Sequence, residues 1–458
     1  MKKKVIVIFD IGKTNKKLLL FDNRLNIVYQ KEEKFKTVID EDGDECDDID
    51  LIESWIHHSL SDLLTSNMFE PVAVNFSTCG ASLVCIDEKG KRLTPVYNYL
   101  KQIPPAIQND LFEKYGGKFE FCRKTASPAL GCLLNSGIQI LWIKEKKRDI
   151  FNRTSRILHF PQYLSFILTK TAVSESTSIG CHTFLWDFDN NSYHPWLKNE
   201  NIALPEPIPN THTFPIEVSG RKIYVGIGIH DSSASLVPYL KGSRNNFLLI
   251  STGTWCINMN PFNHSPLTEE QLKMDCLSFL DIKQKPVKSS RLFIGNIHDL
   301  YTDLLSDYFK VTQSSFKTLK TNESLLNTYL SVNKDHIFFK KGVPDSYIDK
   351  TNIIDLSVFS DFSEAYHHFM YDLVFLNKKS IDLILDDNNC VNSIYISGGF
   401  ARNEIFVRLL ASYYPDKTVY TSKIDNSSAL GAALVIWDTV FMEHTAEINL
   451  GLKKWNTF

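Results

Sequence analysis

The hydrophobic pattern at the start of the chain predicts three consecutive strands. Residues Val5–Phe9 are continuously apolar and mostly β-branched, as in a central strand that is buried on both faces. Further strands are predicted over Lys17–Phe21 and Asn26–Gln30, and short polar turns separate the three. We therefore expect an antiparallel meander with Asp10 at the carboxyl end of its first strand.

The same pattern returns in the second half of the chain. Two predicted strands, Asn246–Ile250 and Trp255–Met259, flank a small polar turn that contains Gly253. Gly12 holds the corresponding place in the first turn of the chain. A strand–turn–strand unit near the start of each half indicates two related domains.

Strands and helices alternate through the rest of the sequence, which predicts an α/β fold. We expect two domains, formed by residues 1–240 and 241–458. The acidic segment 40–50 is predicted to be a loop, and residues 105–170 are predicted to be largely helical. Other predicted strands are 71–77, 83–87, 223–229 and 393–396; other predicted helices are 51–66, 363–385, 404–413 and one that starts near residue 427.

The composition excludes several classes of protein. The 458 residues are 43% hydrophobic and 22% charged with a net charge of −3, so a nucleic-acid partner is not expected. The nine cysteines are scattered without a C-x-x-C pair, which favours reduced thiols in a cytoplasmic protein over a zinc site or disulfides. No apolar stretch is long enough to span a membrane, so no membrane partner is expected either.

Several turns carry residues that suit phosphoryl transfer. This chemistry needs donors around nucleotide phosphates, a carboxylate near a metal ion, and a group that accepts the proton of the attacking hydroxyl. Glycine turns let backbone N–H groups approach phosphate oxygens, and the turns at Gly12 and Gly253 could clamp a triphosphate from two sides. Asp10 and Asp231 each follow a predicted strand. Gly398-Gly399 precedes a helix and would let a flat adenine ring approach.

Each of these features also has an ordinary structural explanation. Either glycine turn alone is well explained as a plain hairpin. Asp10 suits a turn-capping residue, Asp231 suits a helix N-cap, and Gly398-Gly399 suits a tight strand-to-helix turn. Their joint occurrence, in one order along the chain, is what favours a nucleotide-dependent phosphotransferase.

In that order the segments resemble the FGGY carbohydrate kinase family of the actin-like ATPase superfamily. The resemblance runs from about Lys4 to Trp437. It is carried by two phosphate-loop motifs, a motif around the base, an adenosine motif and a helix motif: Asp10-Ile11-Gly12-Lys13-Thr14-Asn15-Lys16-Lys17, Ser251-Thr252-Gly253-Thr254-Trp255, Gly228-Ile229-His230-Asp231-Ser232-Ser233-Ala234, Gly398-Gly399-Phe400-Ala401-Arg402-Asn403, and Phe160-Pro161-Gln162-Tyr163-Leu164 with Leu168-Thr169.

The resemblance implies two ribonuclease-H-like domains, each with a mixed sheet flanked by helices, that close over ATP, Mg²⁺ and a sugar in the cleft between them. Asp231 would be the catalytic base and Asp10 would hold the metal through water. The implied ATP contacts are Gly12, Lys13, Thr14, Asn15, Lys17, Thr252, Gly253, Thr254, Gly398, Gly399 and Asn403. The implied sugar contacts are Thr78, Gly80, Asn98, His230 and Asp231.

Departures from the family pattern affect the expected substrate. Lys13 replaces a threonine of the family pattern, and with this change the loop resembles that of rhamnulokinase-like and fuculokinase-like members. Gln162 replaces an aspartate. Thr78-Cys79-Gly80-Ala81-Ser82 stands where many members have a sugar-contacting stretch. We expect a ketose, such as a 6-deoxyketohexose or a ketopentose. A polyol or aldose kinase, and a non-catalytic sensor of ATP or sugar, are the alternatives; a homodimer is left open.

Overall fold

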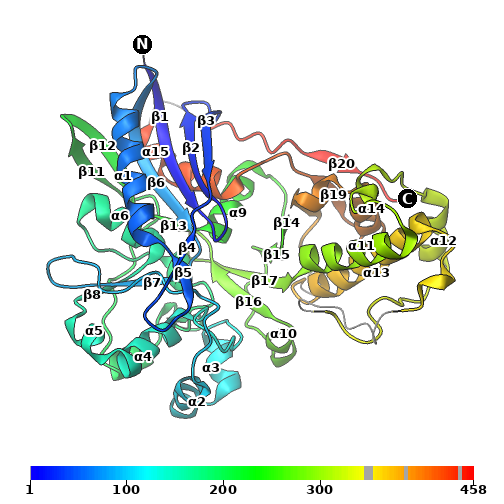
Figure 1. Ribbon diagram of the computed structural model, residues 1–458, viewed down its shortest axis with the longest axis horizontal. Helices are drawn as coiled ribbons and strands as arrows, with labels where there is room; N and C mark the ends of the chain where they lie inside the picture. Colours follow the sequence, from blue (N-terminus) through cyan, green and yellow to red (C-terminus); the bar gives the residue numbers. More distant parts are fainter. Residues whose placement is uncertain (1, 345–353, 386–389, 442–445) are drawn as a thin grey trace.

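The first half of the chain is built around a mixed sheet that contains the opening meander. The computed structural model describes residues 2–344, 354–385, 390–441 and 446–458 (Figure 1). The strands of this sheet are β1 (Lys3–Ile11), β2 (Lys16–Asp22), β3 (Ile27–Glu33), β6 (Phe69–Thr78), β11 (Thr213–Val218), β12 (Arg221–Gly226) and β13 (Ile229–His230). Their order is β11-β12-β6-β1-β2-β3, and β13 pairs with β6. The strand β1 runs parallel to β6 and antiparallel to β2.

Helices cover both faces of this sheet, which explains why β1 is apolar at consecutive positions. On one face Val7 and Phe9 pack in one core with residues of two helices, and on the other face Ile6 and Ile8 pack in a second core. The first face is covered by α1 (Ile49–Thr65) and α6 (Phe160–Thr169), and the second by α9 (Asp231–Gly242) and α15 (Ser427–Val440).

The second half repeats this arrangement around its own sheet. The strands are β14 (Phe247–Thr252), β15 (Cys256–Asn260), β16 (Cys276–Leu280), β17 (Pro286–Leu292), β18 (Ser393–Gly398), β19 (Thr418–Thr421) and β20 (Lys453–Trp455), in the order β16-β17-β15-β14-β18-β19-β20. Here β14 pairs antiparallel with β15 and parallel with β18, as β1 does with β2 and β6. The predicted fold of two mixed sheets flanked by helices is confirmed.

The remaining elements lie outside the two sheets. In Figure 1 four helices gather at the outer end of the second half, namely α11 (Ile294–Phe309), α12 (Glu323–Ser331), α13 (Phe362–Asp382) and α14 (Glu404–Tyr413). Below the first sheet lie α2 (Pro105–Lys114), α3 (Lys118–Lys124), α4 (Ser136–Lys146), α5 (Arg148–Arg153), β7 (Leu83–Ile86) and β8 (Arg156–His159). The shorter elements are α7 (Ser176–Ile179), β9 (Trp186–Asp187), β10 (Ser192–Tyr193), α8 (Trp196–Asn199) and α10 (Glu269–Lys273).

Two segments differ from the prediction. The acidic segment 40–50 is not simply a loop: its first residues form the turn of a hairpin between β4 (Thr37–Ile39) and β5 (Glu45–Asp47). Within residues 105–170 the short strand β8 pairs with β7, although helices make up most of that stretch. Short strands of this kind depend on a distant partner, so local pattern does not reveal them.

The helices α9 and α15 pack against each other at backbone distance. An added Cβ on Gly431 of α15 would lie 1.8 Å from the carbonyl oxygen of Ala234 in α9. The small residues Ala429, Ala432 and Ala433 of α15 are completely buried beside this contact. Although α15 comes late in the sequence, it packs on the first sheet. The predicted domain boundary after residue 240 stays a prediction.

The described residues hold no helix that is long and apolar enough to cross a membrane. The nine cysteines all lie within the described residues and form no disulfide with one another.

The contact at Gly431 predicts that Gly431→Ala destabilises the protein. Helix propensity alone would stabilise the variant by roughly 0.5–1 kcal/mol. Overpacking against the carbonyl oxygen of Ala234 should outweigh this and lower the free energy of unfolding by about 1–3 kcal/mol. Urea unfolding followed by circular dichroism measures the change. Gly399→Ala is the matched control, because a Cβ there meets no atom within 4 Å. A Gly431→Ala variant as stable as the parent would contradict the close packing.

Candidate active site

Asp10 lies at the carboxyl end of β1, where three parts of the chain meet. Its Cα pairs with Lys17 in β2 and with Ser77 in β6. The Ser428 hydroxyl of α15 donates a hydrogen bond to Asp10 Oδ2 over 2.9 Å. Burial raises the pKa of Asp10 to about 6; the Ser428 hydrogen bond opposes this shift, and the charge of Asp231 adds to it. The carboxyl groups of Asp10 and Asp231 are therefore electrostatic neighbours.

Asp231 is the first residue of α9 and is held by its neighbours at the helix start. Its Oδ1 atom accepts a hydrogen bond from the Ser232 amide over 2.6 Å and lies 3.2 Å from His230 Nε2. Burial acts to raise the pKa of Asp231, but the contact with His230 and the bonds from Ser232 outweigh it and lower this pKa. The Asp231 side chain stays 38% exposed, so its carboxyl group is accessible.

A buried thiol contacts the same histidine. Cys181 Sγ lies 3.3 Å from His230 Nε2, and His230 Nδ1 lies 3.1 Å from the Ser233 hydroxyl. That hydroxyl donates to the carbonyl oxygen of Leu280, so it accepts from His230. Burial acts to lower the pKa of His230, but Cys181 and Asp231 outweigh it and raise the pKa well above its ordinary value. The raised pKa of His230 favours an imidazolium beside the carboxylate of Asp231.

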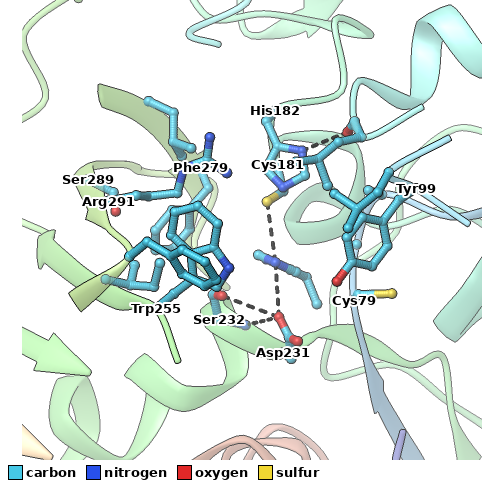
Figure 2. A pocket seen from close by; sticks show the side chains of 18 residues that line it. Cys79, Tyr99, Cys181, His182, Asp231, Ser232, Trp255, Phe279, Ser289 and Arg291 are labelled. Carbon is cyan, nitrogen blue, oxygen red and sulfur yellow. Dashed lines mark hydrogen bonds and ion pairs between the residues drawn. The ribbon is translucent and has the colours of Figure 1, made fainter. Parts of the chain in front are cut away.

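A cavity of about 470 Å³, here termed the Asp231 cavity, opens beside this group (Figure 2). Its walls come from both halves of the chain: residues 79–81, 99–100, 134, 181–182 and 230–232 on one side, and residues between 255 and 293 on the other. A site between two sheets suits a small ligand that must meet groups from both.

Three of the five predicted sugar contacts line this cavity, namely Gly80, His230 and Asp231. The other two do not. Thr78 is buried, and its hydroxyl donates to the carbonyl oxygen of Cys79. Asn98 Oδ1 accepts a hydrogen bond from the amide of Leu100 and so shapes the turn that carries the cavity residues Tyr99 and Leu100.

Sequence reasoning missed the aromatic walls of the cavity. Tyr99 and Trp255 lie on opposite sides, from the first and second halves of the chain. The Trp255 ring is 46% exposed, and its centroid lies 4.5 Å from that of Phe293. The Arg291 guanidinium lies 5.7 Å from the centroid of the Trp255 ring. An exposed tryptophan directly after a glycine turn was the one local signal that could have identified this wall. Phe279, Cys181 and His182 carried no such signal.

The turn between β1 and β2 holds the residues of the first predicted phosphate loop. The Gly12 amide donates to the Asn15 carbonyl oxygen over 3.0 Å, which closes the turn, and Thr14 is exposed. Lys13 Nζ lies 5.6 Å from the centroid of the Tyr99 ring, beside the Asp231 cavity. Lys17 instead donates to Asn426 Oδ1 at the start of α15 over 2.9 Å.

The second predicted phosphate loop meets the adenosine motif in one cavity. Gly253, Thr254, Gly399 and Asn403 all line a cavity of about 270 Å³, here termed the Gly399 cavity. A neighbouring cavity of about 750 Å³ shares Gly399 and Asn403 with it. The lining residues that sequence reasoning missed are Gly295, His298, Asp299, Phe316 and Phe400.

Two predicted nucleotide contacts have evident structural tasks. The Thr252 hydroxyl donates to the Ser397 carbonyl oxygen and accepts from the Phe400 amide, so it joins β14 to the turn after β18. Gly398 has a φ of 83°, and a Cβ there would lie 1.8 Å from the Thr252 carbonyl oxygen. These two residues hold the Gly399 cavity in shape.

The described residues include no group of three or more His, Cys, Asp or Glu side chains placed to hold a metal ion. Mg²⁺ commonly uses only one or two carboxylates and takes its other ligands from water and substrate phosphates. Asp10 fits that pattern, because a buried carboxyl group with a raised pKa and a second carboxylate nearby would be stabilised by a cation.

Comparison with known proteins shows which proteins the chain is similar to. Residues 5–208 match the model of the FGGY family of carbohydrate kinases, N-terminal domain. This part of the chain is similar to that domain. It holds Asp10, the first predicted phosphate loop and most of one side of the Asp231 cavity.

The curated proteins to which the chain is similar include kinases. A rhamnulokinase of Halalkalibacterium halodurans is 24% identical over 54% of this chain and 54% of that protein. An L-fuculokinase of Haemophilus influenzae is 20% identical over 94% of this chain and 93% of that protein. The chain spans about half the length of the rhamnulokinases it matches.

Solved structures share the fold over nearly the whole chain. A carbohydrate kinase of Novosphingobium aromaticivorans superposes with a TM-score of 0.80 at 23% identity and covers all of this chain and 95% of that one. A xylulose kinase of Lactobacillus acidophilus gives a TM-score of 0.77 at 16% identity and covers 99% of this chain and 93% of that one. At these identities the likeness establishes the fold.

The open setting of Gly253 predicts that Gly253→Val weakens nucleotide binding without unfolding the protein. A Cβ there lies 3.8 Å from its nearest protein atom, the Trp255 carbonyl oxygen, so the loop tolerates it. The side chain would push a phosphate away and remove a charge-assisted hydrogen bond, which raises the KM for ATP roughly tenfold to a hundredfold. Steady-state kinetics measure this, with the acceptor KM and the melting temperature as controls. An unchanged KM for ATP would mean that the second loop does not contact the phosphates.

Proposed function

We propose that this chain is an ATP-dependent carbohydrate kinase that transfers the γ-phosphate to a hydroxyl of a small sugar. The observation that carries the proposal is the placement of an accessible carboxylate, Asp231, in the wall of a cavity between the two sheets. The match to the FGGY N-terminal domain and the kinase relatives support the same activity.

The two aspartates have environments that suit different tasks. The pKa of Asp10 is raised and that of Asp231 is lowered, so Asp231 loses its proton at a lower pH than Asp10 does. Titratable neighbours whose pKa values are pushed apart are typical of a catalytic pair. Asp231 would act as general base and accept the proton of the attacking hydroxyl. The imidazolium of His230 would keep it ionised until that proton arrives.

Asp10 would hold Mg²⁺ through water, and the ion would supply positive charge to the ATP phosphates. We propose that the backbone amides around Gly12 and Gly253 contact those phosphates from two sides. Lys13, Thr14 and Asn15 belong to the first of these turns, and Thr254 belongs to the second. Gly399 and Asn403 would support the adenosine, while Thr252 and Gly398 hold that part of the site in shape.

A ketose is the acceptor that we favour, because relatives are named for rhamnulose and L-fuculose. The aromatic walls at Tyr99 and Trp255 suit the apolar face of a sugar better than a short polyol. A polyol or aldose acceptor remains the alternative. A non-catalytic sensor is disfavoured, because binding alone does not require an ionised base.

We propose a cytoplasmic enzyme, because none of the nine cysteines is paired with another in a disulfide. A homodimer remains open.

Replacing Asp231 with asparagine should abolish phosphorylation while ATP still binds. The amide keeps the shape of the side chain but cannot accept the proton, so kcat should fall by about 10²–10⁴-fold. ADP formation coupled to a sugar acceptor measures kcat, and calorimetric titration with ATP measures binding. Asp189→Asn, a change at a partly exposed carboxylate that pairs with Arg123 and does not line the cavity, serves as the control. Near-normal turnover in Asp231→Asn would eliminate this residue as the base.

Removing the charge of His230 should shift the acidic limb of the pH–rate profile to higher pH. The pKa of Asp231 would rise towards its ordinary value or above it once the imidazolium is gone. Since turnover requires the carboxylate, activity in His230→Gln should then be lost at a higher pH than in the parent. The pH dependence of kcat/KM for the acceptor measures this. His264→Gln, at an exposed histidine, is the control. An acidic limb that does not move would mean that His230 leaves the basicity of Asp231 unchanged.

A further inference from the structure

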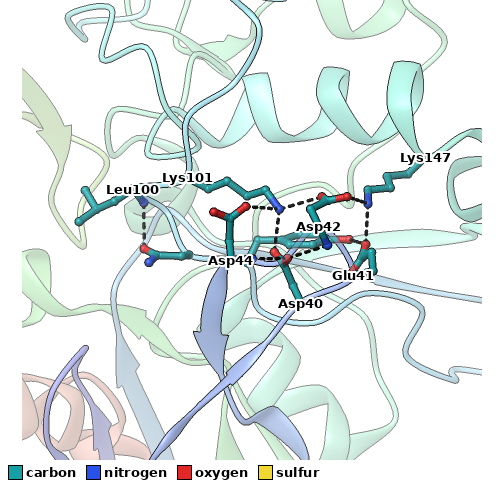
Figure 3. A network of polar contacts seen from close by, with 9 residues as sticks. Asp40, Glu41, Asp42, Asp44, Leu100, Lys101 and Lys147 are labelled. Carbon is teal, nitrogen blue, oxygen red and sulfur yellow. Dashed lines mark hydrogen bonds and ion pairs between the residues drawn. The ribbon is translucent and has the colours of Figure 1, made fainter.

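The ammonium group of Lys101 lies inside a turn made of acidic residues. This acidic turn, residues 40–44, joins β4 to β5 (Figure 3). Lys101 Nζ lies 2.7 Å from Asp40 Oδ2, 2.7 Å from Asp42 Oδ2 and 2.9 Å from Asp44 Oδ2. The Lys101 side chain is only 7% exposed and the Asp40 side chain is fully buried. An ion pair with three carboxylates and this degree of burial holds its lysine far more firmly than a pair on an open surface.

The acidic turn is also held by hydrogen bonds among its own residues. Asp40 Oδ1 accepts from the amides of Asp42 and Asp44 over 2.9 and 3.0 Å, and its backbone amide donates to the Asp44 carbonyl oxygen. One carboxylate oxygen of Asp40 thus shapes the turn, and the other binds Lys101. Burial acts to raise the pKa of Asp40, but Lys101 and the turn amides outweigh it and lower this pKa.

Lys101 fixes the segment that forms one wall of the Asp231 cavity. Tyr99 and Leu100 line that cavity directly before Lys101. The turn that carries them is closed by the Lys101 amide, which donates to the Asn98 carbonyl oxygen, and Leu100 is 56% exposed. Leu100 therefore has little packing of its own, and the ion pairs of Lys101 anchor the end of the turn that carries it.

The same hairpin reaches the first phosphate loop. Asp47, the last residue of β5, lies 2.8 Å from Lys16 Nζ and 3.7 Å from Lys13 Nζ. Lys13 in turn lies over the ring of Tyr99. The hairpin therefore holds the wall at one end through Lys101 and the phosphate loop at the other end through Asp47.

We infer that Lys101 is a positioning residue for the acceptor, which places Tyr99 and Leu100 against the bound sugar by anchoring them in the acidic turn. This inference rests on the proposed kinase function and adds a determinant of acceptor binding to it. The alternative is that Lys101 only stabilises the fold. Lys147, which contacts the same turn, would then be its equivalent.

Lys147 provides a matched control for that alternative. Its Nζ atom lies 2.5 Å from Asp42 Oδ1 and 3.0 Å from Glu41 Oε1, in the same acidic turn. Both lysines also lie over the ring of Trp142, at 5.1 Å for Lys101 and 5.3 Å for Lys147. Lys147 stands at the end of α4 and does not line the Asp231 cavity.

The test compares Lys101→Met with Lys147→Met, each of which keeps the aliphatic stem and removes the charge. In Lys101→Met the KM for the acceptor sugar should rise at least about tenfold, since a small displacement at a binding site can cost up to about 10²-fold. The KM for ATP should stay unchanged. Lys147→Met should alter neither KM, and Lys101→Arg, which keeps the charge, should recover much of the acceptor affinity.

Hydrogen exchange gives a readout that needs no activity. Amides of residues 98–101 should exchange faster in Lys101→Met than in the parent and in Lys147→Met. Equal exchange in the two methionine variants, or an acceptor KM raised equally in both, would overturn the inference. If no sugar, polyol or aldose supports ADP formation in the parent protein, the proposed function fails instead. Exchange at residues 98–101 then still decides whether Lys101 anchors the wall.

Discussion

The close contact between α9 and α15 sets the geometry on which the candidate site depends. Gly431 lets α15 approach the backbone of α9 at Ala234. Each contact residue lies one helical turn after a residue of the site: Ala234 follows Asp231, and Gly431 follows Ser428. The contact thereby holds Asp231, the proposed base, near the hydroxyl that binds Asp10. A wider approach would separate the two carboxylates and remove the coupling between them.

The electrostatics of the site follow from this crowding. Asp10 and Asp231 are close enough to influence each other. The charge of Lys17 does not offset the burial of Asp10, whereas His230, in direct contact with Asp231, helps to offset the burial of that carboxylate. His230 is itself held by Cys181 and Ser233. The same principle recurs at Lys101, where fixed carboxylates hold a cation so that nearby residues keep their place. In both places a buried charge is retained because its partners surround it.

The sequence pattern predicted the elements whose signal is local. The continuous apolar strands before Asp10 and Gly253 were predictable, because a strand that is buried on both faces is apolar at consecutive positions. The repeated hairpin is confirmed by the matching pairings of β1 and β14. The sequence predicted Gly80, His230 and Asp231 as sugar contacts, and the last two belong to a short motif of the family that the chain resembles. Tyr99, Arg291 and Lys101 were missed, because each gains its role from a partner far away in the sequence. No pattern around Lys101 indicates that its partners lie some sixty positions earlier.

The central claim is that the Asp231 cavity binds a sugar hydroxyl for phosphorylation by ATP. The most direct measurement is the transfer of labelled γ-phosphate from ATP to each member of a panel of ketoses, aldoses and polyols by the purified protein with Mg²⁺. The account predicts that at least one ketose becomes labelled and that ADP forms in equal amount. ATP turnover that no member of the panel stimulates, with no labelled acceptor, would contradict it.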